Sequence, residues 1–264
     1  MDLTDAYENG AYIPGSADYP PRWEAQAQAF RKALGALFET LDYGPGPRHA
    51  MDLFHPTGRA EGVVVFIHGG YWRRFDRAQW SHLAAGVVAR GWAVAMPSYT
   101  LAPDARIAAI TSEMAEAVTA AALRIPGRIV VTGHSAGGHL AARMRCEDVT
   151  LPDDVAARLK RIVPISPLSD LRPLMQTEMN ADLRLDADEA RRESPALHTD
   201  LRDVPTTVWV GGAERPAFLD QARWLGDAWP RTKVVIRDGK HHFDIIEEME
   251  APDGALTEAL VGGL

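Results

Sequence analysis

The sequence predicts an α/β fold: a mostly parallel central sheet with helices on both faces and a small lid-like insertion. Short apolar runs rich in Val and Ile alternate with longer segments of helical character from about residue 63 to the C-terminus. Such alternation is typical of successive strand–helix units whose strands run parallel. No Gly/Ser-rich linker or internal repeat divides the 264 residues, so we expect a single domain over residues 1–264.

The positions of these runs predict the individual elements. Strands are expected near 62–68, 92–96, 128–133, 161–166, 206–211 and 232–237. Helices are expected near 76–90, 104–124, 136–146, 216–229 and at the C-terminus. The segment 41–54 should add one or two strands at the edge of the sheet.

Two segments lie outside this alternation. Residues 1–40 form an N-terminal arm and helix rich in aromatic residues and proline, which either packs on the body of the domain or covers a pocket; both interpretations stay open. The segment from about 167 to 201 is too long for a simple strand-to-helix connection. Its leucines and methionines, set among many charges, predict short amphipathic helices over the site.

The sequence Gly133-His134-Ser135-Ala136-Gly137 stands where a predicted strand turns into a predicted helix. A sharp turn of this kind strains the backbone of the serine and exposes its hydroxyl near a helix N-terminus, which favours negative charge. The flanking glycines let neighbouring segments approach without a Cβ clash. A bare G-x-S-x-G is common, but this context indicates a nucleophilic Ser135.

A second motif lies upstream, where an apolar strand runs into His68-Gly69-Gly70. Hydrolysis of an acyl bond passes through a tetrahedral oxyanion that needs preorganised N–H donors. Two consecutive glycines let a loop turn its amides inward, so Gly69 and Gly70 are candidates for half of an oxyanion hole. The amide of Ala136 would supply the other half. On its own, Gly-Gly would predict only a turn.

A nucleophilic serine needs a histidine base and an acid that orients it, and the order serine, acid, histidine suits this topology. His241 and His242 follow the last predicted strand, and spacing alone places both within reach. Glu214 ends the segment after the preceding strand and is the candidate acid. Asp203 lies before that strand and Asp220 inside the next predicted helix, so both are worse placed.

Together these motifs resemble the serine-dependent kynurenine formamidases (arylformamidases) of the α/β-hydrolase superfamily, near the hormone-sensitive-lipase-like esterases. The specific element is the pentapeptide H-G-G-Y-W, because the wider esterase group usually has H-G-G-G there. The resemblance extends over most of the chain. Further matching segments are Tyr43-Gly44-x-x-x-Pro47-Arg48, Met51-Asp52-Leu53-Phe54-x-Pro56, Ser166-Pro167-Leu168-Ser169-Asp170-Leu171, Ser194-Pro195 and Ala217-Phe218-Leu219-Asp220-Gln221.

The resemblance implies an α/β-hydrolase fold and a role for each motif residue. It assigns Ser135 as nucleophile, His242 (directly before Phe243) as base, Glu214 as acid, and Gly69, Gly70 and Ala136 as oxyanion donors. The relatives have aspartate at the acid position. A glutamate there still orients the imidazole and stabilises the imidazolium.

Aromatic side chains predict the contacts with the substrate. Tyr71 and Trp72 put bulk where esterases have a third glycine, which would restrict the acyl side to a small group such as formyl. Phe218 and Phe243 are expected to contact an aryl leaving group. Each of these four residues could instead belong to the core.

Composition excludes several classes of function. A formal net charge of −8 argues against a nucleic-acid partner, and the longest apolar run is too short for a membrane span. The first residues lack the features of a signal peptide, and Cys146 is the only cysteine, so we expect a cytoplasmic protein without disulfides. No H-E-x-x-H or comparable pair predicts a metal, and no cofactor is expected.

Three functions stay open at this stage. The first is hydrolysis of N-formyl-kynurenine to kynurenine and formate through a Ser-His-Glu triad. The second is a generalist carboxylesterase or thioesterase acting on short acyl substrates, and the third is a non-catalytic binding protein on a hydrolase fold. The expected partner is a small-molecule acyl substrate, and a homodimer and a monomer are both compatible with the sequence.

Overall fold

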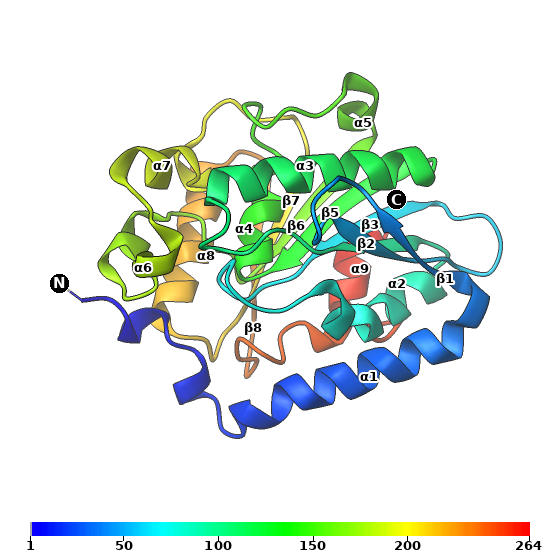
Figure 1. The fold of residues 1–264 in the computed structure, drawn as a ribbon, viewed down its shortest axis with the longest axis horizontal. Helices are drawn as coiled ribbons and strands as arrows, with labels where there is room; N and C mark the ends of the chain where they lie inside the picture. Colours follow the sequence, from blue (N-terminus) through cyan, green and yellow to red (C-terminus); the bar gives the residue numbers. More distant parts are fainter. Residues whose placement is uncertain (1) are drawn as a thin grey trace.

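The computed structural model describes residues 2–264, and an eight-stranded sheet forms its centre (Figure 1). The strand order is β1-β2-β4-β3-β5-β6-β7-β8. The strands are β1 (Phe38–Asp42), β2 (Ala50–Phe54), β3 (Gly62–Ile67), β4 (Ala93–Pro97), β5 (Arg128–His134), β6 (Leu159–Ile165), β7 (Thr206–Gly211) and β8 (Thr232–Arg237). Strand β2 is antiparallel to β1 and β4, and all other neighbouring pairs are parallel. The predicted α/β class is confirmed.

Side chains alternate between two cores on either side of the sheet. In β3, Val63, Val65 and Ile67 face one core and Val64 and Phe66 face the other, as expected for a strand buried on both faces. The helices α3 (Ile107–Arg124), α4 (Ala136–Arg143) and α8 (Pro216–Ala228) cover the first face. The helices α1 (Tyr19–Leu34), α2 (Ala85–Ala89) and α9 (Ala255–Val261) cover the second, below the sheet in Figure 1.

Three elements differ from the sequence prediction. The segment 41–54 does hold two strands, but β1 begins at Phe38 and β2 lies inside the sheet between β1 and β4. The helix predicted at 76–90 is mostly a 3-10 helix (Arg77–Ala84) followed by the short α2. The carbonyl of Ala78 accepts from Arg31 Nη1 (2.5 Å), which competes with the α-helical bond from residue 82. The short helix α5 (Asp153–Arg158) was not predicted.

The arm and the insertion consist of short helical turns. The arm has 3-10 turns at Asp5–Tyr7, Gly10–Tyr12 and Ser16–Asp18, and a further 3-10 turn at Gly35–Leu37 follows α1. The insertion contains a 3-10 turn (Arg172–Gln176), α6 (Asn180–Leu183), α7 (Ala187–Arg192) and a second 3-10 turn (Pro195–Leu197). A last 3-10 turn at Glu247–Met249 precedes α9. Within residues 2–264, no helix combines the length and apolar character that a membrane crossing requires.

Candidate active site

The serine motif forms a sharp strand-to-helix turn, as the sequence predicts. Strand β5 ends at His134, α4 begins at Ala136, and Ser135 between them has φ 58° and ψ −116°, a conformation that costs a non-glycine residue energy. A Cβ on Gly137 would lie 1.9 Å from the carbonyl oxygen of Ile67, so only glycine fits there. The Ser135 residue is 3% exposed, less than expected from its motif, because it lies on the wall of an inner cavity.

Two buried side chains orient the peptide groups of the H-G-G loop. The Tyr99 hydroxyl donates to the carbonyl of His68 (3.0 Å), and His68 Nδ1 lies 2.8 Å from the carbonyl of Gly69. In a trans peptide the N–H points opposite to the C=O, so the N–H groups of Gly69 and Gly70 point away from Tyr99 and His68. Within residues 2–264 neither N–H has an acceptor, and both glycines line the cavity.

The helix end supplies a third free N–H. The carbonyl of Ser135 accepts from His139 N (3.0 Å) along the helix, so the N–H of Ala136, in the same peptide group as that carbonyl, points outward from the first turn of α4. The described part of the chain offers it no acceptor. Negative charge is favoured at this end of a helix. The arrangement of the three N–H groups suits an oxyanion.

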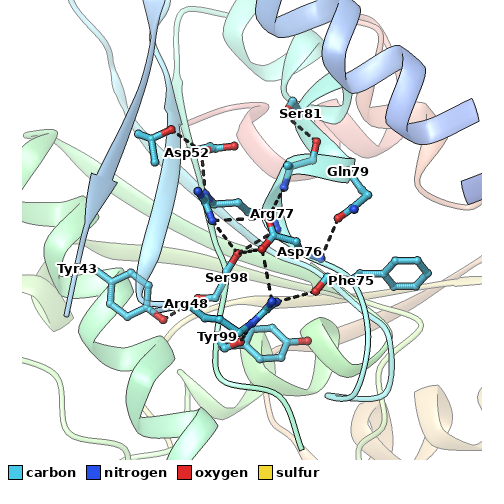
Figure 2. A network of polar contacts seen from close by, with 12 residues as sticks. Tyr43, Arg48, Asp52, Phe75, Asp76, Arg77, Gln79, Ser81, Ser98 and Tyr99 are labelled. Carbon is cyan, nitrogen blue, oxygen red and sulfur yellow. Dashed lines mark hydrogen bonds and ion pairs between the residues drawn. The ribbon is translucent and has the colours of Figure 1, made fainter. Parts of the chain in front are cut away.

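A polar network behind the H-G-G loop fixes its far end (Figure 2). Arg48 donates from Nε to the carbonyl of Tyr99 (2.7 Å) and from Nη2 to the carbonyl of Phe75 (2.7 Å). Asp76 accepts from the Ser98 hydroxyl (3.1 Å), and Figure 2 shows these groups meeting where β4 ends. One guanidinium therefore joins the end of the loop to the segment that carries Tyr99.

Glu214 and His242 form a buried pair. His242 Nδ1 lies 2.6 Å from Glu214 Oε2, and because a carboxylate only accepts, Nδ1 carries the proton. That tautomer leaves Nε2 of His242 as the basic nitrogen, and His242 lines the same cavity as Ser135. The neighbouring ring of His134 lies 4.6 Å away; burial holds the pKa of His134 well below its usual value, so it adds no positive charge.

The acid has a support that the sequence did not reveal. Glu214 Oε1 accepts from the Ser166 hydroxyl (2.5 Å) and from the N–H of Gly211 (2.8 Å), so both carboxylate oxygens are satisfied. Ser166 follows β6 with φ 46°, and this strained position aims its hydroxyl at Glu214. One sequence signal could have indicated this contact: Ser166 comes directly after a parallel strand that neighbours the strand before Glu214.

The other candidates for base and acid are occupied elsewhere. The His241 ring accepts from the backbone N–H of Phe243 at Nδ1 (3.1 Å) and lies 3.1 Å from the Tyr19 hydroxyl at Nε2. Asp220 is exposed and pairs with Arg223 one turn along α8 (3.2 Å). Asp203 is exposed and pairs with Arg231 (2.5 Å).

A cavity of about 630 Å³ contains Ser135 and His242 on its wall. Its opposite wall comes from the arm between Thr4 and Ala17, and from Glu178 and Met179 of the insertion. Both interpretations that the sequence left open are therefore met: the arm packs on the body of the domain through Tyr7 and also covers the pocket. A volume of this size is ordinary for a small-molecule site.

The predicted substrate contacts divide into two pairs. Tyr71 and Phe243 line the cavity, whereas Trp72 and Phe218 do not. Trp72 is fully buried with its edge against the ring of His139 (5.1 Å), on the side of the loop away from the cavity. Phe218 is also buried, and its ring packs on the imidazole of His242 (4.4 Å), so it supports the histidine from behind.

One cluster outside the cavity brings metal-ligand types together. Ligand atoms of Cys146, Asp148 and His198 lie within 4.8 Å of one another, at the end of α4 away from Ser135. Arg143 already donates to both oxygens of Asp148 (3.0 and 2.6 Å), and burial raises the pKa of the Cys146 thiol to about 12. A cationic neighbour and a protonated thiol do not suit a metal site.

Comparison with known proteins identifies enzymes that are similar to this chain in sequence and in structure. The chain is 28% identical to a kynurenine formamidase of Salmo salar over 87% of this chain and 83% of that protein, and 29% identical to that of Danio rerio over 84% and 80%. A crystal structure of a protein from Silicibacter sp. TM1040, named a putative thioesterase, is 56% identical with a TM-score of 0.96, covering 98% of this chain and 99% of that one. An esterase of Pyrobaculum calidifontis has the same fold (TM-score 0.69, 19% identity, 92% and 90% coverage).

The fold, the serine turn and these relatives define a hydrolase of the α/β-hydrolase fold, similar to the kynurenine formamidases, as the sequence resemblance indicated. The chain belongs to the BD-FAE family, whose profile matches residues 51–225. This match spans β2 to α8 and includes the serine motif and Glu214.

Proposed function

We propose that this hydrolase cleaves N-formyl-kynurenine to kynurenine and formate, with Ser135, His242 and Glu214 as its catalytic triad. The proposal adopts for this chain the activity named for its relatives in Salmo salar and Danio rerio. The observation that carries it is an aromatic wall in the cavity that holds Ser135.

The aromatic wall consists of four rings from three separate parts of the chain. They are Trp23, Phe75, Trp80 and Phe243, all of which line the cavity. Trp23 lies at their centre, 4.8 Å from Trp80, 5.5 Å from Phe243 and 6.3 Å from Phe75. Such a wall suits stacking with an aromatic leaving group, and the formanilide of N-formyl-kynurenine supplies one.

In the proposed reaction Ser135 Oγ attacks the formyl carbon and gives its proton to His242 Nε2. Glu214 holds Nδ1–H and stabilises the imidazolium, while the N–H groups of Gly69, Gly70 and Ala136 bind the oxyanion. When the C–N bond breaks, the leaving aromatic amine takes the proton from His242. Water, deprotonated by His242, then attacks the formyl–Ser135 ester. The ester bond breaks, His242 returns the proton to Ser135 Oγ, and formate leaves.

The test compares acyl groups and leaving groups on the purified enzyme without added metal. We expect kcat/KM for N-formyl-kynurenine to exceed that for p-nitrophenyl esters, and to fall steeply from formyl to acetyl to butyryl. A preference for butyryl or longer esters with no cleavage of the formamide would replace this proposal with a general esterase.

The second candidate function is thioester hydrolysis. It rests on the name of the 56% identical protein from Silicibacter sp. TM1040. The same triad would attack a thioester carbonyl, and the thiolate would leave. Acetyl-CoA and butyryl-CoA belong in the same assay: cleavage of these with no cleavage of N-formyl-kynurenine would favour the thioesterase.

A further inference from the structure

The arm that closes the cavity is a fixed wall. Its carbonyl at Tyr7 accepts from the Tyr71 hydroxyl, and the Tyr7 hydroxyl accepts from Gln221 Nε2 (2.9 Å) on α8. The insertion holds it too, since the Thr4 hydroxyl accepts from the N–H of Glu178 (2.9 Å). These bonds tie the arm to three separate elements, so the residues between Thr4 and Gly10 keep a defined position over the site.

Asn9 is a buried polar side chain of this arm without a partner. It is 6% exposed and lines the cavity. Among residues 2–264, nothing forms a hydrogen bond with its side-chain carboxamide. Its side-chain oxygen and nitrogen are not fully enclosed by protein and so can be reached from the cavity, which leaves them free to bond to a molecule bound there. A carboxamide offers both donors and an acceptor.

Two opposite charges line the same cavity beside Asn9. Glu8 lies on the arm and Arg74 on the loop after the H-G-G motif, and both are exposed. Neither takes part in an ion pair within residues 2–264, whereas the neighbouring Arg73 pairs with Asp182 (2.6 Å). Glu8 is nevertheless placed, because its carboxylate accepts from the N–H of Gly10 (2.8 Å).

Both charges act on one buried group, the phenol of Tyr71. Burial raises the pKa of Tyr71 well above its usual value, with the Glu8 carboxylate adding to the rise and the Arg74 guanidinium opposing it. The Tyr71 hydroxyl donates to the carbonyl of Tyr7, directly before Glu8, and Arg74 N donates to the carbonyl of Gly70, directly before Tyr71. Because Tyr71 lines the cavity, the anion and the cation lie at the same end of the pocket.

We propose that Asn9, Glu8 and Arg74 form a subsite for a zwitterionic α-amino-acid group on the leaving-group side of the substrate. Glu8 would accept from the ammonium, Arg74 would bind the carboxylate through its planar guanidinium, and Asn9 would bond to either. This inference rests on the proposed function, because N-formyl-kynurenine ends in such a group. It adds a specificity element of which two residues, Glu8 and Asn9, lie on the arm, before the segment matched by the family profile (51–225).

The test uses two formanilides with the same scissile bond. N-formyl-kynurenine carries the amino-acid group, and 2′-formamidoacetophenone lacks it. We expect Glu8→Gln, Arg74→Gln and Asn9→Leu each to lower kcat/KM for N-formyl-kynurenine about tenfold, mainly through KM. For 2′-formamidoacetophenone we expect changes below about twofold, because the subsite is not used.

Matched controls separate a local subsite from a change in net charge. Glu24→Gln and Arg59→Gln remove the same charges at exposed positions away from the cavity, and should leave both substrates unaffected. Equal losses on both formanilides in the three subsite variants would overturn the subsite, as would a wild-type enzyme that does not distinguish the two compounds. Either result leaves the formamidase proposal standing.

If neither formanilide is cleaved, the formamidase proposal is refuted but the subsite is not. A second measurement then tests the subsite. L-kynurenine and 2-aminoacetophenone are then compared as competitive inhibitors of p-nitrophenyl acetate hydrolysis. Tighter inhibition by L-kynurenine in the wild type, lost in Glu8→Gln and Arg74→Gln, supports the subsite. Equal inhibition by the two compounds overturns it.

Discussion

The two walls of the cavity differ in how far the protein itself satisfies the hydrogen bonds of their polar side chains. One wall, here called the floor, comprises Ser135, His242 and the Gly69-Gly70 loop, with Glu214 supporting His242 behind it, at the carboxyl ends of parallel strands. The other, the roof, comprises arm residues 4–17 with Glu178 and Met179. On the floor the Glu214 carboxylate is fully bonded by its neighbours. On the roof the Asn9 carboxamide has no hydrogen-bond partner within residues 2–264, and the Glu8 carboxylate accepts only from the N–H of Gly10.

This difference separates the chemistry from the choice of substrate. Groups that act on a reacting carbonyl must be held in one geometry, which parallel strands and fully satisfied hydrogen bonds provide. Groups that bind a substrate must keep bonding capacity for it. We therefore expect changes on the floor to lower kcat and changes on the roof to alter KM, and the following predictions test the floor from its largest effect to its smallest.

Removal of the nucleophile should have the largest effect. Ser135→Ala is expected to lower kcat by a factor on the order of 10⁴ to 10⁶ for any acyl substrate, because covalent catalysis is lost. The thermal midpoint should stay within a few degrees of wild type, since the hydroxyl contributes little to packing. Wild-type turnover of p-nitrophenyl acetate by pure Ser135→Ala would refute the serine mechanism.

Substitution of the acid, Glu214, should have the second-largest effect on kcat. In Glu214→Gln an amide can donate to Nδ1 of His242 and favour the wrong tautomer, so we expect kcat to fall about 10⁴-fold. Asp220→Asn is the matched control, because that carboxylate lies exposed on α8 and pairs only with Arg223. Its kcat should equal that of the wild type. If instead Asp220→Asn were the crippling change, the assignment of the acid would be displaced.

Three buried histidines around the floor should limit stability in acid. Burial lowers the pKa of His68 to about 4, of His139 to about 3 and of His134 well below its usual value. Each histidine takes up a proton on unfolding once the pH falls below about 6.5, while the folded protein stays neutral there. The free energy of unfolding should therefore fall with decreasing pH, by up to about 1.4 kcal/mol per pH unit for each histidine.

Urea unfolding between pH 7 and pH 5 measures this slope. His139→Gln keeps a donor for the carbonyl of Glu193, which lies 2.6 Å from His139 Nε2, and removes one titrating group. Its slope should be smaller by up to about 1.4 kcal/mol per pH unit. An unfolding free energy independent of pH in this range would contradict the prediction.

The smallest effect is expected from the hydroxyl that orients the H-G-G loop. Tyr99→Phe removes the bond to the carbonyl of His68, and a loosened oxyanion donor should lower kcat about tenfold with little change in KM. Tyr43→Phe removes a similar bond, to the carbonyl of Ser98 (2.6 Å) at the end of β4 and outside the loop. It should lower stability alone; equal losses of kcat in both variants would assign Tyr99 a purely structural role.

The sequence by itself determined the α/β class, the order of the strands and of the longer helices after residue 60, and the position of the serine turn. These features depend on local patterns: alternating apolar runs, glycines beside Ser135, and a serine placed between strand and helix. The sequence also named Glu214 and His242 before the structure brought them to 2.6 Å. Spacing alone could not choose between His241 and His242.

Only the tertiary structure decided which side chains face the cavity. Trp72 and Phe218 belong to motifs but point into the core. Asn9, which no motif marked, reaches the cavity, and Ser166, whose motif gave it no role, reaches the acid. Pairs such as Ser166 with Glu214 are far apart in the chain, and they meet because parallel strands β6 and β7 end at the same edge of the sheet. Local patterns specify the elements, whereas contacts between elements depend on how their faces pack, which no single segment encodes.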